Sequence, residues 1–143
     1  MEALTALQIE ELICKAIDMR AFSYVPYSGF RVGAALLAKN GTIYTGCNIE
    51  NAAYGPTNCA ERTAFFKAIY DGEREFEKIA IVGGMQGMEA DDTCAPCGVC
   101  RQVMMEFCNL KSFKIVLANG KDKEMELTLE ELFPYGFGPE NLK

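Results

Sequence analysis

The chain has 143 residues, half of them hydrophobic, and a net charge of −6. This length suits one domain with a substantial core, so we expect residues 1–143 to form a single domain. An acidic surface repels phosphates, which argues for a small-molecule ligand and against nucleic acid. No apolar run approaches the roughly 18 residues of a membrane span, and the first 20 residues do not resemble a signal segment. We therefore expect a cytoplasmic protein without a membrane partner.

Seven cysteines and no histidine narrow the possible chemistry. In a reducing compartment, an odd number of cysteines favours metal ligands and buried thiols over a disulfide framework. The absence of histidine excludes Ser-His and Cys-His nucleophilic pairs and all imidazole metal sites. Any chemistry must therefore use Cys, Asp, Glu, Lys or Tyr side chains.

The first half of the chain predicts a helix, a hairpin and a second helix. Thr5 and Gln8 form a capping box ahead of apolar residues at helical spacing. Asn40-Gly41 is the favoured pair for a type I′ hairpin turn between two short apolar runs. In order, we expect a helix from Thr5 that ends before Tyr24, strands at 31–38 and 42–48, and a helix over 59–70.

The second half predicts three strands and two further helices. Pro96 precedes apolar residues at helical spacing, and Thr128 with Glu131 begins a short last helix. Gly and Pro make the tail at 133–139 irregular. The strands are expected at 78–82, 113–118 and 124–127.

This order of elements, α-β-β-α-β-α-β-β-α, implies an α/β fold with a mixed sheet and helices on both faces. Cys59 and the segment 96–100 each follow a strand and its loop. We therefore expect two helix N-termini at the same edge of the sheet, where open α/β sheets bind ligands. The partial positive charge of a helix N-terminus also favours thiolates.

Cys97 and Cys100 form a C-x-x-C pair at a predicted helix start, and Cys59 begins another helix. Three thiolates would leave a tetrahedral zinc ion with one open position, which indicates catalysis. Glu61, two residues after Cys59, is placed to carry protons to and from a water molecule at that position. Arg62 is a candidate to donate hydrogen bonds to the sulfurs and offset their negative charge.

Other interpretations of the cysteines remain open. A free cysteine is usually a small core residue, and Cys14, Cys47 and Cys108 fit that description. Cys94 extends the C-x-x-C pair, so an iron–sulfur cluster or a closed structural zinc site with Cys59 as fourth ligand is an alternative.

Structural interpretations also exist for the other site candidates. Asn58 and Glu61 have the spacing of a capping box, and Arg62 is compatible with an ordinary surface cation. Asn48 and Glu50 are compatible with a strand end and turn, and Phe30 with the core.

Four segments resemble consecutive sequence blocks of the small, homotetrameric, zinc-dependent cytidine deaminases. They span most of the chain in the family's order and comprise Phe30-Arg31-Val32-Gly33-Ala34-Ala35, Asn48-Ile49-Glu50-Asn51-Ala52, Thr57-Asn58-Cys59-Ala60-Glu61-Arg62 and Pro96-Cys97-Gly98-Val99-Cys100-Arg101-Gln102. The resemblance implies a three-layer α/β/α cytidine deaminase-like fold with a five-stranded mixed sheet, forming one catalytic domain. It also implies one zinc ion per chain on Cys59, Cys97 and Cys100, with Glu61 as the catalytic proton carrier.

The implied reaction is hydrolytic deamination of cytidine and 2′-deoxycytidine to the uridines and ammonia. By the same resemblance, Asn48 and Glu50 bind ribose hydroxyls, Phe30 lies against the nucleoside and the backbone of Ala60 against the base. Phe137 stacks on a pyrimidine across a subunit boundary, with Phe133 and Tyr135 as alternatives. The resemblance thus implies a homotetramer with shared active sites.

Three rival functions remain: deamination of a nucleoside antibiotic such as blasticidin S, deamination of a polynucleotide, and a non-catalytic zinc-binding interaction module. The acidic charge and short length oppose the polynucleotide. The Asn48 and Glu50 pair favours an ordinary nucleoside, and an intact Glu61 disfavours the non-catalytic module.

Overall fold

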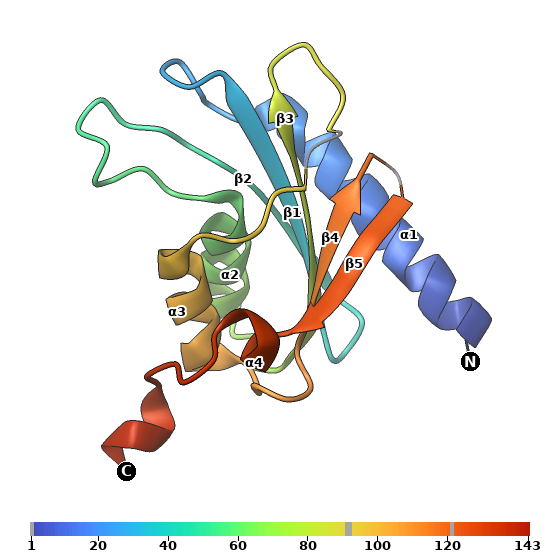
Figure 1. Ribbon diagram of the computed structural model, residues 1–143, viewed down its shortest axis with the longest axis vertical. Coiled ribbons are helices and arrows are strands. Elements are labelled where there is room, and N and C mark those ends of the chain that lie inside the picture. The colour runs from blue at the N-terminus through green and yellow to red at the C-terminus, as the bar shows by residue number, and fades with distance from the viewer. Residues whose placement is uncertain (1, 91–92, 121) are drawn as a thin grey trace.

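Five strands form one mixed sheet in the order β2-β1-β3-β4-β5 (Figure 1). The computed structural model describes residues 2–90, 93–120 and 122–143. The strands are β1 (Phe30–Ala38), β2 (Ile43–Cys47), β3 (Phe76–Met85), β4 (Lys114–Asn119) and β5 (Asp122–Thr128). The helices are α1 (Glu2–Met19), α2 (Ala60–Tyr70), α3 (Gly98–Phe107) and α4 (Leu129–Leu132), with 3₁₀ turns η1 (Arg20–Phe22) and η2 (Pro139–Leu142).

Strand direction follows from the connections. The hairpin joins β1 and β2 in antiparallel fashion, and β1 also pairs antiparallel with β3. The β3 and β4 strands are parallel and are joined by the crossover through α3, whereas β4 and β5 are antiparallel. Parallel neighbours require such a crossover because the chain must return to the same end of the sheet.

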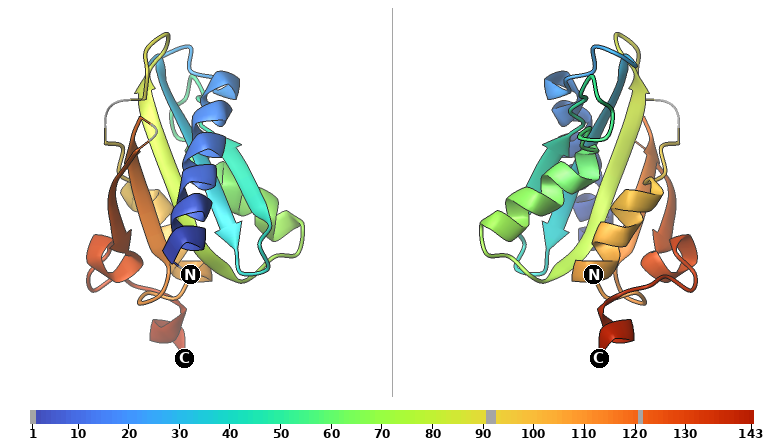
Figure 2. Two further views of the ribbon diagram at one scale, coloured as in Figure 1. Left: turned by 90° about the vertical axis from the view of Figure 1, so that its right-hand side faces the viewer. Right: turned by 90° about the vertical axis from the view of Figure 1, so that its left-hand side faces the viewer.

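The alternation of side chains across the sheet produces two apolar clusters, one on each face. Leu36 and Ile81 point to the face covered by α2 and α3, where Phe65 contacts the rings of Phe76, Phe107 and Phe113. Leu37 and Val82, their neighbours in sequence, point to the face covered by α1. Figure 2 shows these helices on opposite sides of the sheet. The three-layer prediction is therefore confirmed.

Several local predictions differ from the structure. The first helix begins at Glu2, upstream of the Thr5 capping box, and gives way to a 3₁₀ turn after Met19. At the hairpin Gly41 has a φ of +94°, but Asn40 is not among the described residues with positive φ, so the turn is not type I′. Strand β3 continues to Met85 because it pairs with β1 over its whole length.

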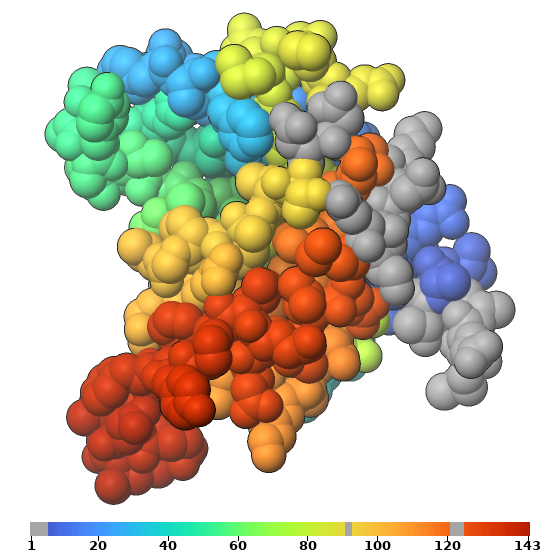
Figure 3. Space-filling model, viewed as in Figure 1, coloured from blue at the N-terminus to red at the C-terminus, as the bar shows by residue number. Residues whose placement is uncertain are grey.

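The tail has no helix or strand over residues 133–138, as expected, and the 3₁₀ turn η2 begins at Pro139, the last residue of the range predicted to be irregular. Figure 3 shows this tail projecting from the body of the molecule on the side where α3 lies. Of the cysteines interpreted as core residues, Cys47 is buried and Cys108 partly buried, whereas Cys14 is exposed and its assignment was wrong. Within the described ranges, no helix combines the length and apolarity needed to cross a membrane.

Candidate metal centre and active site

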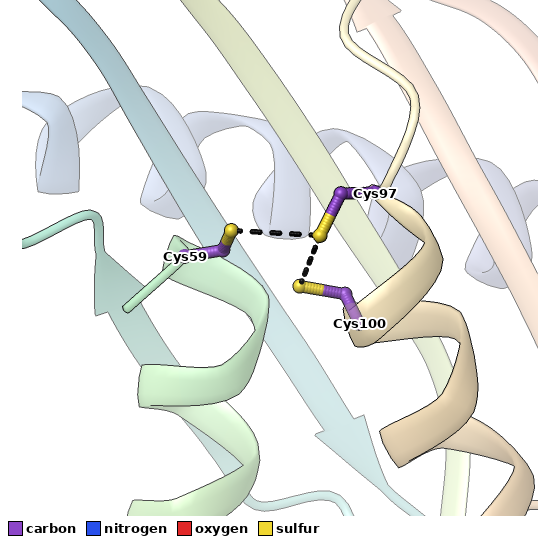
Figure 4. A group of neighbouring side chains, drawn as sticks. All are labelled: Cys59, Cys97 and Cys100. Atoms are coloured by element: carbon purple, nitrogen blue, oxygen red, sulfur yellow. Dashed lines mark hydrogen bonds between the residues drawn. The ribbon is translucent and has the colours of Figure 1, made fainter. Parts of the chain in front are cut away.

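Two helix N-termini meet on one side of the sheet and bring three cysteines together (Figure 4). Cys59 is the N-cap residue of α2, Cys97 is the N-cap residue of α3, and Cys100 lies in the first turn of α3. The Sγ atom of Cys97 is 3.7 Å from that of Cys59 and 3.5 Å from that of Cys100. Neither N-cap thiol makes a side-chain capping hydrogen bond, so both remain available to a ligand.

The three sulfurs fit a zinc ion. Tetrahedral coordination with Zn–S bonds of about 2.3 Å places ligand sulfurs about 3.8 Å apart. The three Sγ atoms lie within 4.8 Å of one another, and two of the pairs are already close to that spacing. Among the described residues no fourth Cys, Asp or Glu joins this group, so the coordination would keep one open position.

Cys94 does not belong to the sulfur group, although it is two residues from the Pro96-Cys97 pair. Its side chain packs beside Gly83 of β3, where a Cβ atom on Gly83 would lie 2.9 Å from the Cβ of Cys94. The described residues therefore form neither a four-cysteine iron–sulfur site nor a closed four-cysteine zinc site.

The electrostatics of the group favour negative sulfur at Cys59. A hydrogen bond from Cys100 is the largest cause that lowers the pKa of Cys59, to about 5, although burial acts in the opposite direction. Arg62 also donates from Nη2 to the Sγ of Cys59 at 3.3 Å. The Nε atom of Arg62 is buried and has no partner among the described groups. Arg62 is therefore a cation directed at the thiolate and not an ordinary surface residue.

Glu61 lies in the first turn of α2 and is only 4% exposed. Burial is the main cause that raises the pKa of its carboxyl group to about 7. The capping-box alternative is wrong, because the N-cap residue is Cys59 and the side chain of Asn58 donates to Thr63 instead. A carboxyl group that titrates near neutral pH can both accept and return a proton.

The segment that contains Asn48 and Glu50 is joined to the cysteine group through the backbone. Ile49 exchanges two hydrogen bonds of 2.9 Å with Asn58, the residue before Cys59. The side chain of Asn48 accepts from the Val32 N–H at 3.0 Å and donates to the Phe30 carbonyl at 2.9 Å. The structure therefore brings the predicted sugar-binding residues next to the helix that carries Cys59.

Glu50 lines a pocket of about 340 Å³ together with Tyr27, Ser28, Tyr54 and Thr57. These four residues were not predicted as site residues. Tyr54 has a φ of +62° and its ring contacts that of Tyr27 edge to face, neither of which a sequence pattern reveals. Only the turn chemistry of Tyr27-Ser28-Gly29 gave a local signal.

The remaining candidates lie in two different environments. Ala60 is fully buried at the start of α2, and Phe30 packs partly buried against the cluster beneath α2 and α3. Phe137 lies in the tail, where its carbonyl accepts from Gln102 of α3 at 2.8 Å and its side chain stays 57% exposed. Among the described residues, more than half of the Phe137 surface is therefore left uncovered.

A three-layer α/β/α fold with three thiols at two helix starts and a buried glutamate beside them defines the class of zinc-dependent base and nucleoside deaminases. Comparison of the chain with known proteins indicates the same class. A family model described as "Cytidine and deoxycytidylate deaminase zinc-binding region" matches residues 7–117. The cytidine deaminase of Sporosarcina psychrophila is 52% identical, with 95% of this chain and 96% of the relative covered.

Two further proteins are similar over nearly their full lengths. The cytidine deaminase of Halalkalibacterium halodurans is 48% identical, with 92% of this chain and 95% of the relative covered. The crystal structure of the cytidine deaminase from Burkholderia pseudomallei has a TM-score of 0.80 at 44% identity, covering 89% of this chain and 97% of that one. The chain belongs to the cytidine deaminase family.

Proposed function

We propose that this protein hydrolyses cytidine and 2′-deoxycytidine to uridine and 2′-deoxyuridine, releasing ammonia, as a zinc-dependent enzyme of pyrimidine salvage. The observation that carries the proposal is the buried carboxyl group of Glu61 in the same first helical turn as Cys59, one of three sulfurs spaced for zinc. The likeness to relatives called cytidine deaminase supports the choice of substrate.

Cys59, Cys97 and Cys100 would hold the zinc ion, which supplies Lewis acidity to activate a water molecule for attack on carbon 4 of the pyrimidine. Glu61 takes a proton from that water molecule and passes it to ring nitrogen 3. Glu61 then takes the remaining proton from the hydroxyl group that has added to carbon 4 and gives it to the amino group, so the bond between carbon 4 and that nitrogen breaks and ammonia leaves. Arg62 partly offsets the charge of the thiolates through its hydrogen bond to Cys59.

Substrate recognition uses the residues around the cysteine group. Asn48 and Glu50 bind the sugar hydroxyls, Phe30 lies against the nucleoside and the backbone of Ala60 contacts the base. Asn48 is supported in this role by its two hydrogen bonds to the backbone of β1, which hold its amide plane fixed.

The assembly we propose is a homotetramer in which Phe137 of one subunit completes the active site of a neighbour. The exposed ring of Phe137, on a tail that projects from the body, supports this arrangement. We further propose one catalytic domain over residues 1–143, acting on a free nucleoside without nucleic acid or membrane partners. The seven cysteines, all among the described residues, form no disulfide, which supports a cytoplasmic location.

Incubation of the purified protein with cytidine tests the function, with uridine and ammonia measured by chromatography. Stoichiometric conversion is expected. The matched variant Glu61→Gln should keep its fold and zinc but lose about a thousandfold or more in kcat, because general acid–base catalysis alone contributes about 10²–10⁴. Near-normal turnover by Glu61→Gln would reject its role. Zinc binding without conversion would instead point to an antibiotic nucleoside or to an interaction module.

A further inference from the structure

The hydroxyl group of Ser28 is at the centre of a small hydrogen-bond network around Glu50. It donates to Oε2 of Glu50 and accepts from the backbone N–H of Phe30 at 3.0 Å. The backbone N–H groups of Tyr27 and Ser28 both donate to Oε1 of Glu50, each at 3.1 Å. One turn therefore supplies three donors to one carboxylate.

This turn is itself held on two sides. Gly29 has a φ of +69°, a conformation that glycine adopts readily, and its N–H donates to the Val25 carbonyl at 3.1 Å. The Gly29 carbonyl accepts from the N–H of Gln86, just after β3, at 2.6 Å. The backbone N–H of Glu50 in turn donates to the Tyr24 carbonyl at 2.9 Å. Backbone hydrogen bonds therefore connect the turn that supplies the donors to the segment that carries the Glu50 carboxylate.

The network leaves the Glu50 carboxylate able to accept one further hydrogen bond. A carboxylate offers about four acceptor positions, two on each oxygen. Two N–H groups fill those of Oε1, and the Ser28 hydroxyl fills one of those on Oε2. One position on Oε2 is left for a ligand, and Glu50 and Ser28 both line the same pocket.

Prior fixation of the carboxylate matters for binding. A glutamate side chain that is free to rotate loses rotamer freedom when it is ordered, and this loss opposes binding if it occurs at that moment. The hydrogen bond from Ser28 is also the main cause that holds the pKa of Glu50 below its ordinary value, so the network stabilises the ionised form of the carboxylate. Charged acceptors make the stronger hydrogen bonds.

We propose that Ser28 is a positioning residue for substrate recognition, whose hydroxyl fixes the Glu50 carboxylate in the rotamer that accepts a hydrogen bond from a sugar hydroxyl. This inference rests on the proposed function, because it takes Glu50 as the sugar-binding carboxylate. A purely structural Ser28 would hold only the turn at 24–29, and its loss would affect all substrates alike.

Steady-state kinetics of Ser28→Ala with two substrates separate these roles. One is cytidine and the other is 2′,3′-dideoxycytidine, which lacks both ring hydroxyls that Glu50 could accept from. We expect the KM for cytidine to rise about threefold to tenfold with kcat within about twofold of wild type. The kcat/KM for the dideoxynucleoside should change by less than about twofold.

A pair of isosteric variants controls for shape. Ser28→Thr keeps the hydroxyl and should behave as wild type, whereas Ser28→Val lacks it and should behave as Ser28→Ala. Ser112→Ala, an exposed serine before β4, controls for a serine replacement elsewhere and should leave both substrates unaffected.

Every result of these experiments either supports or overturns the positioning role of Ser28. Equal losses for both substrates, or an unchanged KM for cytidine, overturn the inference while leaving the proposed function intact. Absence of cytidine turnover by the wild type overturns both. If Ser28→Ala does not fold, the Thr and Val variants carry the test, and a Val variant that also fails to fold assigns the hydroxyl to stability and overturns the inference.

Discussion

At the scale of single residues, Cys94 and Cys97 form a matched pair for testing the metal site. Both belong to the run of C-x-x-C spacings, but only Cys97 lies in the sulfur group. We expect elemental analysis to find about one zinc per chain in the wild type, which leaves the fourth tetrahedral position open. Cys94→Ser should retain the zinc and Cys97→Ser should lose it. Iron in the wild type, or loss of metal from both variants, would contradict the three-cysteine site.

The partly buried thiol of Cys108, the C-cap residue of α3, leads us to expect that stability depends on pH. Burial raises the pKa of its thiol above the ordinary value. Above about pH 9 the unfolded chain therefore ionises this thiol while the folded protein keeps it neutral. The contribution of the neutral, partly buried Cys108 thiol to stability is fully present below the pKa that this thiol has in the unfolded chain, and it is lost as the pH rises above that value.

We expect the free energy of unfolding of the wild type, relative to Cys108→Ala, to fall by about 1.4 kcal/mol per pH unit above that point. Urea unfolding of both proteins at pH 7, 9 and 10, with a reducing agent present, measures the difference. The free energy lost through the cavity that alanine leaves does not depend on pH. If the free energies of unfolding of the two proteins change in parallel with pH, the pKa of Cys108 is not raised in the folded protein.

At the scale of elements, the contact between β2 and α2 fixes the position of Glu61. A Cβ atom on Gly46 of β2 would collide with the Ala60 carbonyl oxygen and lie 2.6 Å from the backbone nitrogen of Ala64. Because both atoms are backbone, the helix as a whole would have to move. Gly46 is thus required for close approach, and the helix start that carries Glu61 depends on it.

Gly46→Ala should therefore lower stability by about 1–3 kcal/mol, as overpacking does, and should also lower activity because α2 is displaced. Thermal unfolding and cytidine turnover measure the two effects. Gly98→Ala is the stability control, since a Cβ at that helical position would have no described atom within 4 Å apart from its chain neighbours and its own helix backbone. A Gly46→Ala protein as stable and active as wild type would mean that α2 can shift without consequence.

At the scale of the whole molecule, the exposed tail predicts that active sites are shared. If Phe137 serves a neighbouring subunit, Glu61→Gln and Phe137→Ala impair different halves of each site. Mixing the two impaired proteins under conditions of subunit exchange should restore part of the activity, because some sites then receive an intact Glu61 and an intact Phe137. Turnover no higher than the sum of the separate proteins, or light scattering that shows an active monomer, would contradict the shared site.

Local sequence signals determined most of the elements and the chemical character of the site. Thr128 and Glu131 form both halves of their predicted capping box, and the order of helices and strands is as expected. The spacing of Cys97 and Cys100 within one helical turn, and of Cys59 and Glu61 in another, is likewise fixed by neighbours in the chain. These features depend on contacts over a few residues, which a sequence pattern can specify.

Tertiary structure alone decided how these segments meet. The sheet order places α2 and α3 side by side, so sulfurs 38 residues apart lie 3.7 Å from each other while Cys94 faces Gly83 instead. The same packing buries Glu61 and raises its pKa, and it brings Ser28 onto Glu50. Burial and contacts between distant segments depend on the whole set of strand pairings, and no spacing within one segment encodes them.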